Sequence, residues 1–76
     1  PGLCRMHRAE VLALRGHLSE AEAEIRLTID SLARQAPWAE GDAWRVLGEI
    51  LVARGAYAEA EAALQEELKR LLAARG

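Results

Sequence analysis

One cysteine and two histidines are the residues of this chain best suited to bind a metal ion. Cys4 and His7 are separated by about one helical turn, so both would lie on one face of a helix. A zinc site needs three or four ligands, and His17 falls in a predicted turn. His7 and Glu10 reverse the order of the Glu-x-x-His motif of di-iron bundles, and the pattern occurs once. We therefore expect neither a metal nor another cofactor.

The carboxylates and hydroxyls of the chain show no arrangement typical of a catalytic site. Catalytic carboxylates have shifted pKa values and lie in clefts, whereas these lie at predicted helix starts and on solvent faces. The glutamates concerned are Glu20, Glu22, Glu24, Glu59, Glu61, Glu66 and Glu67. Ser19 is a predicted helix cap, and no His–Asp pair is placed near Thr28 or Ser31 to activate a nucleophile. Single glycines form no phosphate-binding loop. We expect that the chain is not an enzyme.

Composition restricts the remaining classes of function. The 76 residues make one small domain, and the net charge of −2 opposes binding of nucleic acid through this segment. No apolar run is long enough to span a membrane, so we expect no membrane contact. A single cysteine excludes an internal disulfide and favours a cytoplasmic location. The Pro-Gly start suggests a piece cut from a longer protein.

The chain contains an internal repeat. The tetrad Glu-Ala-Glu-Ala occurs at residues 20–23 and again at residues 59–62, each time after an Arg-Gly pair. Both copies are therefore related by a shift of 39 residues, which we call the 39-residue register. A repeat of this length, with a glycine turn between two helical patterns, is typical of helical arrays.

Four helices are predicted, because Ala, Leu, Glu and Arg dominate the chain. Gly16 and Gly55 end the first and third helices, and Ser19 with Glu22 forms a capping-box pattern at the start of the second. Pro37 is suited to begin the third, although Gly41 weakens a start before Asp42. The predicted helices span residues 3–15, 19–35, 37–54 or 42–54, and 58–75.

The second helix of each unit carries one apolar seam. In the first unit the seam comprises Ala21, Ile25, Ile29 and Leu32, and in the second Ala60, Leu64, Leu68, Leu71 and Leu72. Such a seam must be covered by a neighbouring element. We therefore predict an all-α fold of two antiparallel helical hairpins. The seam of helix four can be satisfied within one chain if helix three covers it.

Residues 41–74 resemble one tetratricopeptide repeat (TPR). The resemblance is carried by Trp44, Leu47 and Gly48, followed by Leu51, Gly55, Tyr57, Ala60 and Leu64. It implies one TPR-like domain over residues 1–76, with repeats at about 3–36 and 37–75, stacked as a short right-handed α-solenoid fragment. Gly16, Ala21, Trp44, Leu47, Gly48, Gly55, Tyr57, Ala60 and Leu64 would be structural, with Gly48 and Ala60 at the close approach of two helices.

The first repeat departs from the pattern. Arg5 stands at the place of Trp44 and Arg8 at the place of Leu47, and the period exceeds the usual 34 residues. The block from Cys4 to Leu64 also resembles the helical-repeat region of actinobacterial LuxR-type transcriptional regulators, through its His-Arg-Ala-Glu and Leu-Gly-Glu-Ile runs. That resemblance implies a role in transcription regulation, with DNA bound by a separate domain.

In TPR arrays the first helix of each unit lines a groove for a partner. The corresponding residues here are Met6, Glu10, Ala13, Leu14, Arg45, Glu49 and Val52. We expect a protein-binding scaffold whose partner is a protein, a peptide or an adjacent repeat of a parent protein, with apolar and basic residues facing Glu10 and Glu49. Two alternatives stay open: a homodimer through Leu68, Leu71 and Leu72, and a ligand-sensing fragment of a regulator. Trp38 is expected to pack at the junction of the repeats, or else to anchor a partner.

Overall fold

The computed structural model describes residues 2–75, and the side chains of residues 5–73. The four helices are α1 (Gly2–Leu14), α2 (Leu18–Gln35), α3 (Glu40–Ala53) and α4 (Tyr57–Arg75). The 3₁₀ turn η1 (Pro37–Ala39) precedes α3. The all-α prediction is confirmed, with four helices in the described residues. Pro37 does begin helical structure, but as a separate tight turn, and α3 starts between the two predicted positions.

The two hairpin turns have the same structure. Gly16 and Gly55 adopt φ angles of 84° and 81°, in the left-handed region that favours glycine. In both turns the residue after the glycine donates its backbone N–H to the carbonyl five residues earlier, at 2.9 Å. The glycine itself donates to the carbonyl three residues earlier, at 3.0 Å. Both bonds belong to the Schellman motif, so the sequence repeat is also a structural repeat at the turns.

The capping-box prediction is wrong. α2 begins one residue before Ser19, and His17 stands at the cap position without a side-chain bond to the helix. Glu22 does not reach back to the helix start. It accepts hydrogen bonds from Arg26 and Arg54 instead. Two strong charge-assisted partners outcompete one backbone N–H for this carboxylate.

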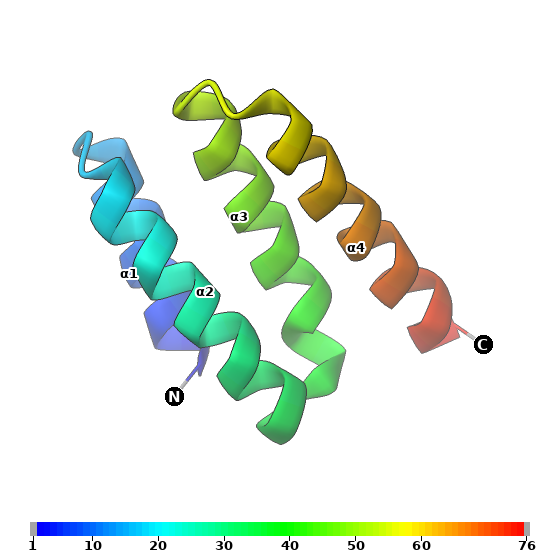
Figure 1. The fold of residues 1–76 in the computed structure, drawn as a ribbon. Helices are drawn as coiled ribbons and strands as arrows, with labels where there is room; N and C mark the ends of the chain where they lie inside the picture. Colours follow the sequence, from blue (N-terminus) through cyan, green and yellow to red (C-terminus); the bar gives the residue numbers. More distant parts are fainter. Residues whose placement is uncertain (1, 76) are drawn as a thin grey trace.

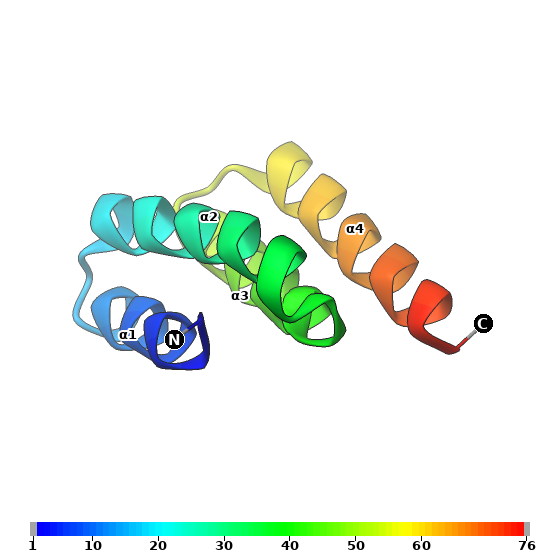
Figure 2. The ribbon, with the colours of Figure 1, turned by 90° about the horizontal axis from the view of Figure 1, so that it is seen from below.

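The helices pack as two hairpins side by side. α1 packs closely against α2, and α3 against α4; α2 and α3 join the hairpins, with a smaller contact between α1 and α3. Figures 1 and 2 show the helices following one another in chain order, with α1 and α4 at opposite edges. The Cα trace measures 36 × 28 × 15 Å, which describes an open slab.

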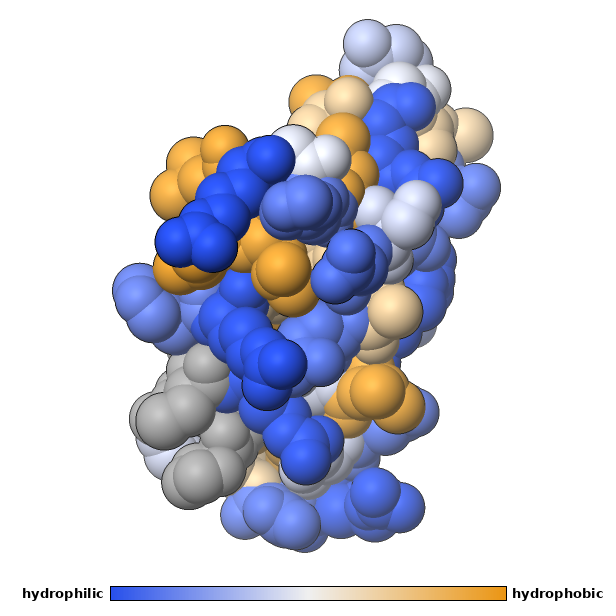
Figure 3. Space-filling view, turned by 90° about the vertical axis from the view of Figure 1, so that its left-hand side faces the viewer, coloured by the Kyte–Doolittle hydropathy of each residue, from blue (hydrophilic) through white to orange (hydrophobic). Residues whose placement is uncertain are grey.

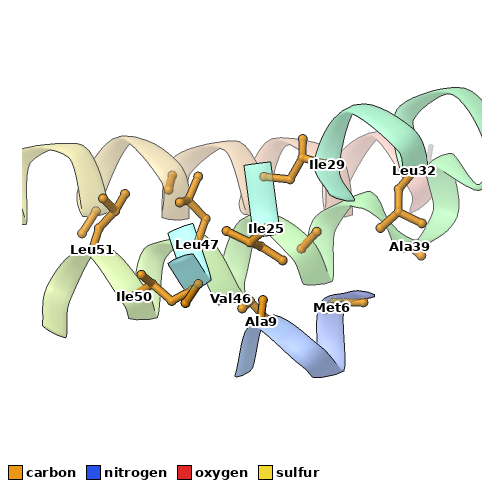
Figure 4. Close-up of a cluster of buried hydrophobic side chains, with 14 residues drawn as sticks. Met6, Ala9, Ile25, Ile29, Leu32, Ala39, Val46, Leu47, Ile50 and Leu51 are labelled. Atoms are coloured by element: carbon orange, nitrogen blue, oxygen red, sulfur yellow. The ribbon is translucent and has the colours of Figure 1, made fainter. Parts of the chain in front are cut away.

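The core lies mainly between α1, α2 and α3. Figure 4 shows the buried side chains meeting from these three helices. α2 contributes Ile25, Ile29 and Leu32, and α1 contributes Met6 and Ala9. Met6 is therefore a core residue, only 7% exposed, and not the partner-facing groove residue that was predicted. Met6 is packed in the core cluster, so this side chain is unavailable to a partner.

α3 and α4 approach each other most closely at Gly48. A Cβ atom added there would lie 2.8 Å from Cδ2 of Leu64 and 3.7 Å from the carbonyl oxygen of Ala60. Leu47 and Ala60 are buried, as is Ala21 in the first hairpin. Glycine at this position lets Leu64 lie directly over the α3 backbone. The close approach is thus possible because Gly48 has no side chain.

Two aromatic residues lie outside the core. Tyr57 was predicted to be structural, but it is 69% exposed at the start of α4. Trp38, for which packing was expected, is 74% exposed. Trp44 alone packs against the core, partly buried. Of the two aromatic residues predicted to be structural, Trp44 is thus partly buried and Tyr57 is exposed.

The apolar seam of α4 is largely uncovered. Leu64, Leu68, Leu71 and Leu72 are about half exposed, whereas Ala60 and Ala63 are buried. α3 therefore covers this seam only in part. α3 buries the alanines of α4 and contacts one side of Leu64 and Leu71, while the outward sides of the leucines stay exposed. No helix within residues 2–75 is both long enough and apolar enough to cross a membrane.

Candidate functional site

A surface hollow of about 280 Å³ lies between α1 and α3. It is lined by Glu10, Ala13 and Leu14 of α1 and by Val46, Glu49, Ile50 and Ala53 of α3. Apolar side chains form most of the lining, and the two carboxylates stand at its rim. Leu14 is 88% exposed, so a large apolar group faces solvent beside the hollow. An uncovered apolar surface with charged groups at its rim is typical of an interaction site.

The repeat explains why these residues meet. Glu10 and Glu49 occupy the same place in the 39-residue register, and so do Leu14 and Ala53. α1 and α3 lie next to each other, so equivalent positions of the two helices open onto one surface. The Schellman turn ends α1 directly after Leu14 and fixes this residue at the end of the hollow.

The structure brings together only part of the predicted groove. Glu10, Ala13, Leu14 and Glu49 line the hollow. Arg45 and Val52 lie on α3 outside the lining, and both are partly or largely exposed. Met6 belongs to the core. Sequence reasoning missed Val46 and Ile50, although their shared helix face with Glu49 was a usable signal.

The electrostatics of the hollow are mildly negative. Arg45 donates a hydrogen bond from Nη1 to Oε1 of Glu49, at 3.2 Å. This pair is exposed, so it contributes only a few tenths of a kcal/mol. Glu10 is partly buried at the opposite rim. The rim therefore presents two carboxylates and one guanidinium to an incoming partner.

A second, broader hollow of about 660 Å³ lies between η1 and the end of α4. Its lining consists of Pro37, Trp38, Glu40, Lys69, Arg70 and Ala73. The charges beside Trp38 are already paired. Arg70 donates to Glu40 at 3.0 Å and lies 5.7 Å from the ring centre of Trp44. Trp38 is therefore an exposed aromatic residue on a surface whose neighbouring charges are paired with one another.

Of the residues with catalytic potential, Thr28 is used for structure. The buried hydroxyl of Thr28 donates to the carbonyl oxygen of Glu24 at 2.8 Å, so it is bonded to its own helix. His7 is exposed on α1, and the side chain of Cys4 lies outside the described residues. Within the part of the chain that the structure describes, no three His, Cys, Asp or Glu residues are grouped to hold a metal ion.

One charge cluster connects the two hairpins, and sequence reasoning missed it. Glu22 of α2 accepts hydrogen bonds from Arg26 at 2.9 Å and from Arg54, at the end of α3, at 2.7 Å. Arg26 also lies 3.7 Å from Glu59 of α4. The hydrogen bond from Arg26, helped by Arg54, holds the pKa of Glu22 below its ordinary value, although desolvation acts in the opposite direction. The Glu22–Arg26 spacing was visible in the sequence, but the Arg54 contact was not.

Comparison with known proteins found no relative of this chain. No family model, no curated protein and no solved structure matches the chain.

Proposed function

We propose that this chain is a non-catalytic, TPR-like protein-interaction module whose binding surface is the hollow between α1 and α3. In this proposal the two hairpins form a fragment of a right-handed α-solenoid. The observation that carries it is the hollow itself, which has an apolar lining and a rim formed by Glu10 and Glu49. The identical glycine turns and the side-by-side hairpins support the solenoid arrangement.

The chemistry of the surface selects the partner. Apolar side chains of an incoming segment would pack against Leu14, Val46 and Ile50. A lysine or arginine in that segment would be attracted to Glu10 and Glu49, whereas a C-terminal carboxylate would be repelled. We therefore propose a peptide segment with alternating apolar and basic residues, bound in helical or extended form.

A peptide fits this surface better than a small molecule does. Ligand pockets usually enclose about 300–1,000 Å³ and bury most of their ligand. The hollow is smaller, at about 280 Å³, and opens to solvent beside Leu14. On the sequence resemblance alone, we also propose that the module serves a cytoplasmic transcriptional regulator, whose DNA contacts would be made elsewhere.

The test is selection of binding sequences from a random 12-residue peptide library displayed on phage, with the whole chain as bait. We expect enrichment of peptides that combine leucine-type residues with lysine or arginine. Replacing both rim carboxylates, Glu10→Lys with Glu49→Lys, should abolish binding of the selected peptides. Both positions lie at the surface, so circular dichroism should show an unchanged fold.

Two control variants separate this surface from the rest of the molecule. Glu20→Lys and Asp30→Lys reverse the same number of charges away from the hollow, and binding should survive both together. Selected peptides that bind the Glu10→Lys, Glu49→Lys variant as tightly as the original chain would overturn the proposal. So would a library that yields no enriched basic and apolar peptides.

A further inference from the structure

The outer edge of α4 exposes a stripe of leucines that α3 covers only in part. Leu64, Leu68 and Leu71 are 41%, 56% and 49% exposed. They recur at intervals of three or four residues, so they lie on one face of the helix. Continuous leucine surface of this kind is unusual on a helix without a partner. We call these three residues the α4 stripe.

The first hairpin shows what covers such a stripe. In the 39-residue register, the counterparts of the α4 stripe are Ile25, Ile29 and Leu32 of α2. These three are only 0%, 7% and 3% exposed. α2 packs against α3 as well as against α1, whereas α4 has α3 as its single extensive neighbour. The same positions are therefore buried on α2, which lies between α1 and α3, and about half exposed on α4, which has α3 alone as an extensive neighbour among the described residues.

A charge pair accompanies the apolar contact between α2 and α3. Arg54, directly after α3, donates to Glu22 of α2 at 2.7 Å and closes the end of the interface. The register counterpart of Glu22 is Glu61, which is exposed on α4. α4 thus repeats both components of the α2 surface, the apolar stripe and the carboxylate at its N-terminal end.

We propose that the α4 stripe binds an amphipathic helix with the chemistry of α3. That helix carries apolar residues with the spacing of Ala43, Leu47 and Ile50, which are buried in α3. It also carries an arginine just beyond its C-terminal end. The arginine pairs with Glu61, as Arg54 pairs with Glu22. This surface lies on α4, away from the α1–α3 hollow, so the inference is independent of the function proposed above.

A second copy of the chain fits the stripe less well. The counterpart of α3 is α1, and Arg8 stands there at the place of the buried Leu47. Arg5, His7 and Arg8 are all exposed. Figure 3, which views the molecule from the side of α1 and α2, shows a mainly hydrophilic surface with separate apolar patches. Docking this edge on the stripe would bury charged groups against leucines.

Pairing two copies of α4 also lacks part of the interface. Leucines would pack against leucines in such a pair. The α2–α3 interface, however, also contains Arg54, which pairs with the carboxylate of Glu22. Two cations in the described part of α4 are already engaged: Arg70 is bonded to Glu40 at 3.0 Å, and Lys69 to Glu66 at 3.3 Å. Neither is available for Glu61. An α3-like helix supplies both the apolar face and the cation.

The test uses the whole chain and a labelled peptide of residues 37–55, which contains the α3 sequence. A lactam between position 45, as Arg45→Lys, and Glu49 holds the peptide helical through side chains that are exposed in α3. Fluorescence anisotropy should show saturable binding with one peptide per chain. Leu68→Glu in the protein should weaken this binding at least about tenfold.

Matched variants test the role of each component. Leu27 of α2 is 58% exposed, nearly the same as Leu68, so Leu27→Glu is the control and should leave binding unchanged. Glu61→Arg in the protein should weaken binding, and Arg54→Glu in the peptide should restore it. That rescue would not occur if Glu61 only maintained the fold of α4.

Three results would overturn the inference. The first is no saturable binding up to millimolar peptide. The second is binding that Leu68→Glu leaves intact, because the peptide would then be replacing α3 in its own place. The third is a concentration-dependent dimer in sedimentation that the peptide does not dissociate, since a second copy would then occupy the α4 stripe.

Discussion

The close approach of α3 and α4 at Gly48 allows a quantitative prediction. A Cβ atom at this position would lie 2.8 Å from Cδ2 and 3.0 Å from Cγ of Leu64. These distances are too short for carbon atoms, so Leu64 must move when Gly48 is replaced. Leu64 is 41% exposed and has room to rotate outward. The cost therefore depends on how much side chain is added.

Alanine and leucine should give different results. For Gly48→Ala, moving Leu64 off its rotamer costs about 0.5–1.5 kcal/mol, and the better helix propensity of alanine returns about 1 kcal/mol. The two effects nearly cancel. For Gly48→Leu, rotation of Leu64 does not make enough room, and α3 and α4 must separate. Overpacking of this kind costs about 1–3 kcal/mol.

Urea unfolding followed by circular dichroism measures the difference. Gly48→Leu should lower the midpoint clearly, and the loss should shrink when Leu64→Ala is added, because the clashing side chain is gone. Gly41→Ala is the matched control in the same helix. Its Cβ would meet nothing closer than 3.7 Å, so stability should be unchanged or rise by up to about 1 kcal/mol. A midpoint for Gly48→Leu equal to that of the original chain would refute the close approach.

Three further predictions concern the charge cluster, the turn and the exposed tryptophan. Glu22→Gln should lower stability by about 1 kcal/mol at pH 7, a melting shift of about 4–8 °C. Because the folded pKa of Glu22 is lowered, its contribution is complete above the ordinary value of 4.5 and is lost as the pH falls below it. The two melting curves should therefore converge in acid, and a constant difference would contradict the ion pairs. Gly55→Ala should cost about 1–2 kcal/mol in urea unfolding through backbone strain at its φ of 81°, with open space around the new methyl group; a neutral result would exclude the left-handed turn. Trp38→Ala should change stability by less than about 0.5 kcal/mol, and a drop of several degrees in melting temperature would show that Trp38 is packed in solution.

The turns and helix faces were predictable because they depend on local sequence. Gly16 and Gly55 determine the ends of α1 and α3, since only glycine adopts their backbone conformation without strain. The spacing of Ile25, Ile29 and Leu32 identifies the buried face of α2. Each of these signals lies within one or two helical turns.

The contacts between helices were less predictable. The same periodicity marks Leu68 on α4 and Ile29 on α2, yet one is exposed and the other buried. Periodicity identifies an apolar face but not the element that covers it. Glu22 illustrates the same limit. It was predicted to cap α2, but its carboxylate instead accepts a hydrogen bond from Arg54, which is 32 residues away in sequence. Four residues of the expected groove line the α1–α3 hollow, whereas Met6 is buried in the core.

The account depends on an open arrangement, in which two like hairpins lie side by side and α4 keeps one apolar edge free. Methyl–methyl nuclear Overhauser effects in the intact chain test this directly. We predict cross-peaks between Ile25 and the methyl groups of Val46 or Leu47, and none between Leu68 or Leu71 and any methyl group of α1. Cross-peaks between α1 and the leucines of α4 would show a closed bundle and would contradict the account.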